Sequence, residues 1–445
     1  MYCFEIRAIT LNLKKEEKWE DETMSNAEAL EADQAVPDPW SLPLETLDVS
    51  KAEIFRQNKH GEYFRRLRQE DPVHFCPESD FGPYWSITKF NDIVAVDSNH
   101  KVFSSHRDIV IGDQPEELYT PMFIAADPPV HDVQRKAAQP AVAPANLAEL
   151  EGIIRQRVGT ILDSLPVGTE FNWVEKVSIE LTTQMLATLF DFPFEDRHLL
   201  PFWSDAAVDV PSTGSPGSSF EKRMEIMQDC LSRFSALWHE RAGQPRKFDF
   251  ISLLAHDPGT KDMINDPMEF LGNLMLLIVG GNDTTRNSIS GGVVALNTFP
   301  EQYDKLRANP GLIPSMVSEI IRFQTPLAHM RRTVLEDFEF QGKQMRKGDK
   351  VVMWYVSGNR DDEVIPDPDH FIIDRDKARH HISFGFGIHR CMGNRVAEMQ
   401  LRILWEEIMK RFERIELVRA PERVPSNFVL GYSSVPVVLH SIKGA

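Results

Sequence analysis

The most informative part of this sequence is FGFGIHRCMG, residues Phe384 to Gly393. A helical pattern of apolar residues, among them Val396 and Met399, begins directly after it, so Cys391 stands at the start of a predicted helix. The free amides of a helix start and the neighbouring Arg390 favour the thiolate form of a cysteine. Glycines let a backbone approach a flat ligand closely. The stretch therefore predicts a thiolate that binds a metal.

The remaining cysteines indicate which metal site to expect. Cys3, Cys76 and Cys230 show no paired spacing with each other or with Cys391, and no C-x-x-C occurs. This argues against a disulfide framework and against structural zinc. A metal with one protein thiolate needs its other ligands from elsewhere, and a porphyrin supplies four nitrogens. Haem iron is therefore the expected metal.

A long helix is predicted from Asp266, as its N-cap, to about Asn297. Pro267 at its first position and Glu269 at its third form a variant of the capping box. Residues 274–279 are apolar on all sides, as in a buried helix. We expect this helix to pass through the core.

The middle of the same helix carries Gly280-Gly281-Asn282-Asp283-Thr284-Thr285. Each glycine costs about 1 kcal/mol relative to alanine inside a helix, so the pair requires a reason. One interpretation is a close helix crossing, with Asp283 paired to a neighbour. The other is a ligand pressed against the helix, with Asp283 and Thr284 handling protons.

The pattern F-x-x-G-x-x-x-C-x-G around Cys391 resembles the haem-binding loop of the cytochrome P450 family. Three further segments resemble family motifs in the expected order: 280–285 the oxygen-activation segment, 319–322 the E-x-x-R pair, and 359–375 the following meander. The resemblance implies a mainly helical fold with a minor β-sheet, a triangular prism with a long central helix over the haem. It covers 40–445, which we expect to form a single haem-binding domain.

The resemblance also implies individual roles. Cys391 would be the axial ligand of the iron in haem b, and Asp283 and Thr284 would be the catalytic residues that handle protons for O2. The Glu319–Arg322 ion pair would be structural. The other residues that the resemblance assigns to haem binding are Phe384, Gly280 and Gly281, together with His131, Arg135, Arg332 and His389, of which the last four would bind the propionates.

Two longer segments, 325–333 and 354–363, resemble the bacterial subfamily that hydroxylates alkanes and fatty acids at the terminal carbon. The resemblance implies that Leu327, Ala328 and Met330 pass over the haem and narrow the cavity. A hydroxylase of terpenes or steroids shares every haem motif and stays a second possibility. A haem-binding sensor or carrier without turnover would leave the Asp283–Thr284 pair unexplained.

Composition limits the partners. With 49 Lys and Arg against 67 Asp and Glu, the net charge of −18 disfavours nucleic-acid binding. No stretch reaches the ~20 apolar residues of a membrane span, and the first residues do not form a signal peptide, so a cytoplasmic protein is expected. No flavin or nicotinamide domain follows the haem motifs, which implies electrons from NAD(P)H through a ferredoxin reductase and a [2Fe–2S] ferredoxin. The basic patch expected to dock the ferredoxin contains Arg135, Lys136, Arg390, Arg395 and Arg402.

Some segments are predicted from composition alone. Residues 1–39 are acidic and end in Val36-Pro37-Asp38-Pro39, which is typical of a disordered leader. Short strands are expected at 73–75 and 84–87, around the turn 81–83. The irregular segments 103–126 and 211–219 are expected to be mobile and to admit a small hydrophobic substrate.

Overall fold

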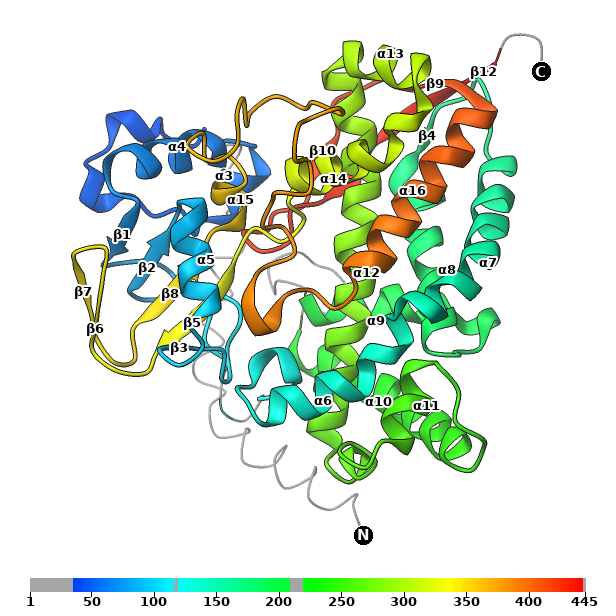
Figure 1. Ribbon diagram of the computed structural model, residues 1–445, viewed down its shortest axis with the longest axis horizontal. Coiled ribbons are helices and arrows are strands. Elements are labelled where there is room, and N and C mark those ends of the chain that lie inside the picture. Colours follow the sequence, from blue (N-terminus) through cyan, green and yellow to red (C-terminus); the bar gives the residue numbers. More distant parts are fainter. Residues whose placement is uncertain (1–34, 115, 117–118, 209–218, 443–445) are drawn as a thin grey trace.

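The computed structural model describes residues 35–442 except 115, 117–118 and 209–218. Helices gather around the long helix α12 (Pro267–Thr298) on one side of the molecule, and the larger sheet lies on the other side (Figure 1). This arrangement confirms the prediction of a mainly helical fold with a minor sheet. No helix in the described part of the chain is long and apolar enough to cross a membrane.

The helices differ greatly in length, from one turn to the full depth of the molecule. Besides α12 they are α3 (Ala52–Arg56), α4 (His60–Glu70), α5 (Phe90–Ser98), α6 (Val130–Ala138), α7 (Pro144–Asp163), α8 (Glu180–Leu189), α9 (Leu199–Val208), α10 (Phe220–Ala242), α11 (Phe250–His256), α13 (Pro300–Ala308), α14 (Ile313–Gln324), α15 (Tyr355–Gly358) and α16 (Asn394–Arg411).

In the described part of the chain, strands form one sheet of five, one of three and two of two. The order in the five-stranded sheet is β1 (Val73–Cys76), β2 (Tyr84–Ile87), β8 (Lys350–Met353), β5 (Met330–Val334) and β3 (Phe103–Ser104). The order in the three-stranded sheet is β4 (Phe171–Asn172), β12 (Pro436–Ser441) and β9 (Phe412–Leu417). The two-stranded sheets pair β10 (Glu422–Arg423) with β11 (Tyr432–Ser434), and β6 (Phe338–Phe340) with β7 (Lys343–Met345). The expected hairpin is present, because β1 pairs antiparallel with β2 in the register Val73 to Ile87.

Helix α12 begins as its sequence predicts. The Asp266 carboxylate accepts hydrogen bonds from the amides of Met268 and Glu269, both at 3.1 Å, and Pro267 occupies the first turn. The helix contacts α8, α9, α14 and α16, so it is surrounded by other helices along much of its length. Its position in the core explains why its first half contains so few polar residues.

The folded region starts earlier than the sequence indicates. The Tyr63 hydroxyl donates to the carbonyl of Pro37 at 2.7 Å, Pro39 is buried, and Val36 packs against a core cluster. The predicted boundary at residue 40 is therefore wrong by about four residues, because contacts with α4 hold this segment. The rest of the expected leader, 1–34, and most of the expected access segment 211–219 lie outside the described residues.

Candidate functional site

The Cys391 loop is shaped by hydrogen bonds and by two glycines. The Cys391 amide donates to the Phe384 carbonyl at 2.8 Å and thereby closes the loop. Gly385 and Gly387 have φ values of 65° and 61°, in the left-handed region that favours glycine. A short turn, η12 (Gly387–His389), and the start of α16 follow. The thiol therefore lies at the entrance of a helix, as predicted.

The surroundings of the Cys391 thiol favour its use as a metal ligand. Burial raises its pKa, whereas hydrogen bonds from the amides of Gly393 and Asn394 and the charge of Arg135 lower it. The cysteine nevertheless has exposed surface, unlike Cys76 and Cys230, which are buried. No group of three or more His, Cys, Asp or Glu side chains could hold a metal within the described ranges. A single thiolate is thus the metal ligand that the described residues offer.

The two glycines in the middle of α12 have different surroundings. A Cβ on Gly280 would meet no atom within 4 Å, and this residue is exposed although its helix runs through the core. A Cβ on Gly281 would lie 2.6 Å from the Cδ2 atom of Leu186 on α8. Open space beside Gly280 fits a bound ligand, whereas close helix packing accounts for Gly281. The two glycines therefore differ in their surroundings, and proton handling by Asp283 and Thr284 stays a prediction.

Asp283 and Thr284 point to different partners. The Asp283 carboxylate is fully buried, forms an ion pair with Arg286 at 2.9 Å and accepts a hydrogen bond from Ser204 on α9 at 3.3 Å. Burial raises the pKa of Asp283 to about 6, opposed by the charge of Arg286. The Thr284 hydroxyl donates to the Gly280 carbonyl at 2.8 Å, within α12.

Arg286 continues the chain of charged groups toward the surface. Its guanidinium also pairs with Asp205 on α9 at 2.9 Å, and the side chain of Asp205 is 52% exposed. Asp283, Arg286 and Asp205 therefore form a continuous path of ionisable groups from the core to solvent. A buried carboxyl with a pKa near neutrality at the end of such a path is suited to proton transfer.

Four basic side chains meet beside the Cys391 loop, and we call His131, Arg135, Arg332 and His389 the basic cluster. The rings of His131 and His389 lie 4.4 Å apart, edge to face. His131 Nε2 and both ring nitrogens of His389 are buried and lack a hydrogen-bond partner among the described residues. Buried polar atoms in proteins are almost always paired, so these nitrogens indicate a polar ligand.

The charges around His389 indicate the sign of that ligand. Burial, together with the nearby Arg332, His131, Arg135 and His100, lowers the pKa of His389 to about 2. A site crowded with cationic and neutral donors suits an anion, such as the carboxylates of haem propionates. His100 was missed in the sequence analysis, because a single histidine after α5 follows no recognisable spacing.

Arg332 is held by a residue that the sequence analysis also missed. Its Nη2 atom donates to Oδ1 of Asp97 at 2.6 Å, and its Nη1 atom donates to the Arg331 carbonyl at 2.7 Å. Asp97 lies near the end of α5, and its side chain is 1% exposed. The local sequence contains no signal for this pair, because its two members are 235 residues apart.

The ion pair Glu319–Arg322 is fully buried on α14. Two hydrogen bonds of 2.7 Å join the two side chains, and the guanidinium of Arg375 donates a further hydrogen bond to Glu319 at 3.1 Å. Arg322 also donates to the carbonyls of Asn359 and Pro368 in the segment that leads to the Cys391 loop. These contacts fit the predicted structural role, since they attach that segment to α14.

The three residues expected to narrow the cavity do not share one environment. Leu327 is half-buried and forms an isolated bridge to Val429. Met330 is half-buried against the core of the larger sheet. Ala328 is 0% exposed and belongs to the core cluster that includes Trp354. The structure places Ala328 in packed core, because successive residues of an extended chain face opposite sides.

The segment after Leu327 is anchored to the neighbouring loops. The His329 ring is buried, its Nε2 atom accepts from the Ile111 amide at 3.2 Å, and its Nδ1 atom lies 3.1 Å from the Asn427 carbonyl. Arg331 pairs with Asp113 at 2.7 Å and donates to the carbonyl of Ile111. The residues around Ile111 in the expected access segment are therefore attached to β5 and to the residues just before it.

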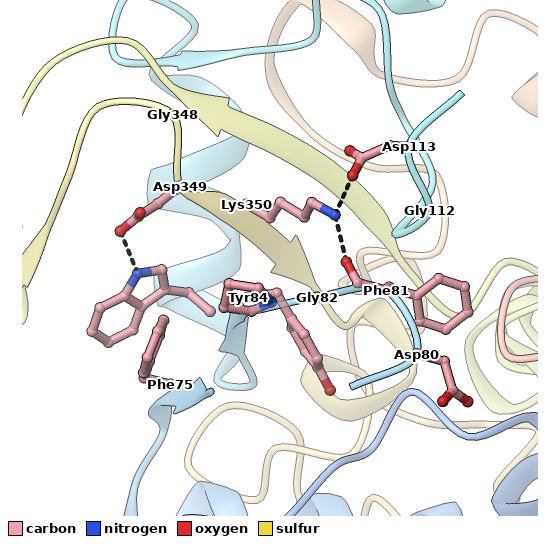
Figure 2. Close-up of a pocket in the computed structure, with 12 residues that line it drawn as sticks. Phe75, Asp80, Phe81, Gly82, Tyr84, Gly112, Asp113, Gly348, Asp349 and Lys350 are labelled. Carbon is pink, nitrogen blue, oxygen red and sulfur yellow. Dashed lines mark hydrogen bonds and ion pairs between the residues drawn. The ribbon is translucent and has the colours of Figure 1, made fainter. Parts of the chain in front are cut away.

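A large pocket lies at one side of the larger sheet, and Asp113, the partner of Arg331, is among its lining residues (Figure 2). Its volume is about 690 Å³, and Phe75, Trp85 and Lys350 are among its lining residues. The Lys350 ammonium contacts Asp113 at 2.6 Å and the Phe81 carbonyl at 2.5 Å, and Asp349 accepts from Trp85 Nε1 at 2.9 Å, as Figure 2 shows. Its polar groups thus bind each other, and the pocket contains none of the predicted site residues.

The expected basic patch is smaller than its sequence suggests. Lys136, Arg390 and Arg395 are exposed. Arg402 pairs with Glu151 at 3.0 Å and with Glu406 at 2.9 Å, so its charge is largely neutralised. Arg135 is half-buried and donates to the Arg390 carbonyl. Two glutamates from α7 and α16 therefore compensate much of the charge that Arg402 would add to the patch.

Comparisons with known proteins identify the family. A family model described as cytochrome P450 matches residues 311–435. The solved structure of cytochrome P450-153 from Novosphingobium aromaticivorans is 44% identical, with a TM-score of 0.83, and the match covers 91% of this chain and 100% of that one. This chain belongs to the cytochrome P450 family. It is a monooxygenase whose cofactor is haem b.

Two other P450 relatives cover nearly the same length. Linalool 8-monooxygenase from Pseudomonas putida is 37% identical over 414 residues, which are 89% of this chain and 99% of that protein. Methyl-branched lipid omega-hydroxylase from Mycobacterium tuberculosis (strain ATCC 25618 / H37Rv) is 30% identical over 415 residues, 90% and 96% respectively. These enzymes are named for terpene and lipid substrates.

The residues described above fit the haem of a P450. Cys391 offers one thiolate, the basic cluster offers unpaired buried nitrogens for two carboxylates, and Gly280 leaves open space beside α12. These three features come from elements far apart in the sequence. The donor set is that of a haem–thiolate site with propionate ligands.

Proposed function

We propose that this P450 inserts one oxygen atom from O2 into the terminal C–H bond of medium-chain alkanes or fatty acids. The names of two relatives support attack at a chain end, since position 8 ends the main chain of linalool and omega denotes the last carbon of a lipid. The observation that carries the proposal for this chain is the anchored segment from Leu327 to Arg331. Hydrogen bonds and an ion pair fix His329 and Arg331 in this segment, so a cavity wall that contains Leu327 would not readily retreat.

Terminal selectivity requires such a wall, because the primary C–H bond is the strongest in a linear chain. Electronic preference alone would favour the inner carbons. A rigid constriction admits only the methyl end to the oxidant and thereby reverses that preference. In this proposal Leu327 narrows the cavity, while Ala328 and Met330 support it from the packed side.

Proton supply is assigned to the residues of α12. The overall reaction is RH + O2 + 2 e⁻ + 2 H⁺ → ROH + H2O, and haem, when bound, supplies the chemistry that activates O2. The Asp283 carboxyl, whose pKa is about 6, exchanges its proton with solvent on the side of Asp205, while the permanently charged Arg286 holds the two carboxylates together. Thr284, beside the open space at Gly280, is the hydroxyl that orients the final proton donor.

Haem binding is assigned to the loop and to the basic cluster. Cys391 would supply the thiolate ligand of the iron, Phe384 and Gly280 would contact the haem, and His131, Arg135, Arg332 and His389 would bind its propionates. Electrons come from NAD(P)H through a ferredoxin reductase and a [2Fe–2S] ferredoxin that docks on Lys136, Arg390 and Arg395. Reversing the charge of Lys136 and Arg395 should slow reduction and flatten its salt dependence, and unchanged kinetics would remove this docking site.

The test is the product distribution from octane and dodecanoic acid, with purified protein, a surrogate ferredoxin system and gas chromatography. We expect the terminal alcohol as the main product. Leu327→Ala should shift oxidation to inner carbons, whereas Leu335→Ala, an exposed residue after β5, should not. An unchanged product ratio in Leu327→Ala would refute the narrowing role.

A terpene hydroxylase is the second candidate, because the linalool enzyme is 37% identical over nearly the whole chain. Linalool added to the same assay distinguishes the two. Rapid turnover of linalool without any linear-chain product would replace alkanes and fatty acids by terpenes as the substrate class, and it would leave the monooxygenase assignment intact.

A further inference from the structure

Asp97 is the point at which three parts of the haem region meet. Its carboxylate accepts hydrogen bonds from Arg332 Nη2 at 2.6 Å, from the Phe386 amide at 2.7 Å and from the Tyr355 hydroxyl at 2.9 Å. These donors belong to β5, to the Cys391 loop and to α15. A buried carboxylate with three donors, one of them charged, is fixed in a single orientation.

The backbone at Asp97 also shapes the Cys391 loop. A Cβ on Gly387 would lie 2.4 Å from the Asp97 carbonyl oxygen, and one on Gly385 would lie 3.3 Å from its Oδ2 atom. Both glycines have positive φ, so the loop bends around the end of α5. The position of Asp97 therefore determines where the loop that carries Cys391 runs.

We propose that Asp97 is a positioning residue for haem. It fixes the guanidinium of Arg332 and the amide of Phe386 relative to each other, so that a propionate donor and the thiolate loop contact the same haem. The inference rests on the proposed assignment of Arg332 and Cys391 to the haem site. Asp97 itself does not touch the haem, and it acts through these two neighbours.

A second consequence concerns charge. Asp97 compensates the buried guanidinium of Arg332, whose side chain is only 3% exposed. Loss of this negative charge leaves an uncompensated cation in the basic cluster. A nearby positive charge favours the reduced, less positive iron, so the reduction potential should rise. A purely structural role of Asp97 predicts no such systematic shift.

The experiment compares the holoenzyme of Asp97→Asn with wild type and with Asp92→Asn. Asp92 is a matched control, since it is a second buried carboxylate on α5 and accepts from Gln341 at 2.7 Å, away from the loop. Haem loss is measured by transfer to apomyoglobin, and the potential is measured by spectroelectrochemical titration. Asp97→Asn should lose haem about tenfold faster or more, the size expected when hydrogen bonds to a charged group are lost, and its potential should rise.

Tyr355→Phe removes one of the three donors and keeps the charge, so we expect faster haem loss by only a few-fold and no change in potential. If Asp97→Asn does not fold, Asp97→Glu keeps the charge but displaces the carboxylate, and it should lose haem faster at the wild-type potential.

Equal haem loss and equal potential in Asp97→Asn and Asp92→Asn would overturn the inference, as would wild-type haem loss in Asp97→Glu. Failure of the proposed function looks different. In that case wild type itself would not bind haem through a thiolate, or Cys391→Ser would bind haem exactly as wild type does.

Discussion

The basic cluster beside Cys391 and the pocket at the edge of the sheet differ in how their polar groups are satisfied. In the cluster, His131 and His389 keep buried nitrogens without partners in the described part of the chain. In the pocket of about 690 Å³, Lys350 binds Asp113 and Asp349 binds Trp85, so its charged groups compensate each other (Figure 2). Buried polar atoms without partners distinguish the cluster from the pocket, and the volume of the pocket does not make it the functional site.

The physical reason lies in desolvation. A buried donor without a partner costs about 1–3 kcal/mol, and a bound ligand can recover that free energy. Surface hollows carry no such cost, because water satisfies their polar groups. Variants in the two regions test this difference, and they follow in order of the effect that we expect, from the largest to the smallest.

Replacement of the thiolate should have the largest effect. Cys391→Ser removes the axial ligand, so the reduced carbon-monoxide complex should lose its haem–thiolate absorption and product formation should fall to background. Cys76→Ser is the control, because this buried thiol lies in a different core cluster and should keep the absorption. A haem–thiolate spectrum in Cys391→Ser would show that the haem ligand lies outside the Cys391 loop.

Asp283→Asn should lower product formation by about 10²-fold, the contribution of one acid–base group. The pKa of Asp283 is about 6, so its carboxyl is protonated below that pH and ionised above it. Product formed per NAD(P)H should therefore decline as pH rises through about 6 in wild type. The ratio should be independent of pH in Asp283→Asn, and a shared break near pH 6 would assign the titration to another group.

Substitution of the two glycines of α12 should have smaller effects, and it tests whether their different surroundings produce different stabilities. Gly280→Ala should stabilise the helix by up to about 1 kcal/mol, since its methyl group meets open space, and should alter turnover. Gly281→Ala should destabilise the protein, because its methyl group would lie 2.6 Å from Leu186 and overpacking costs about 1–3 kcal/mol. Thermal midpoints of both holoenzymes measure this difference. Equal midpoints would mean that the two surroundings are alike.

Substitution in the pocket should have the smallest effect. Phe75→Ala removes a side chain that is 41% exposed and packs on Trp85 with ring centroids 4.9 Å apart. We expect kcat and KM within about twofold of wild type, together with a slightly lower thermal midpoint, the usual result of a change outside the site. A tenfold change in KM would show that the pocket takes part in substrate binding, and it would contradict the difference in function between the pocket and the basic cluster.

Features that depend on neighbouring residues could be predicted from the sequence. The cap of α12 at Asp266, the β1–β2 hairpin, the Cys391 loop before α16 and the Glu319–Arg322 pair all follow from short-range spacing. The Cys391 loop indicated haem iron, the family motifs supported it, and the comparisons confirmed the family. The extent of the leader was misjudged, because composition does not show that α4 binds the chain around Pro37.

Features that depend on distant neighbours were decided by the tertiary structure alone. The sequence presents Gly280 and Gly281 as equals, and only the position of Leu186 separates them. It presents Arg402 as a free charge, although Glu151 from α7 neutralises it. The local sequence does not mark Asp97 as important, because its partner Arg332 lies 235 residues later in the chain. Local rules specify elements and their ends, whereas burial and pairing depend on which elements meet, and packing of the whole chain sets that.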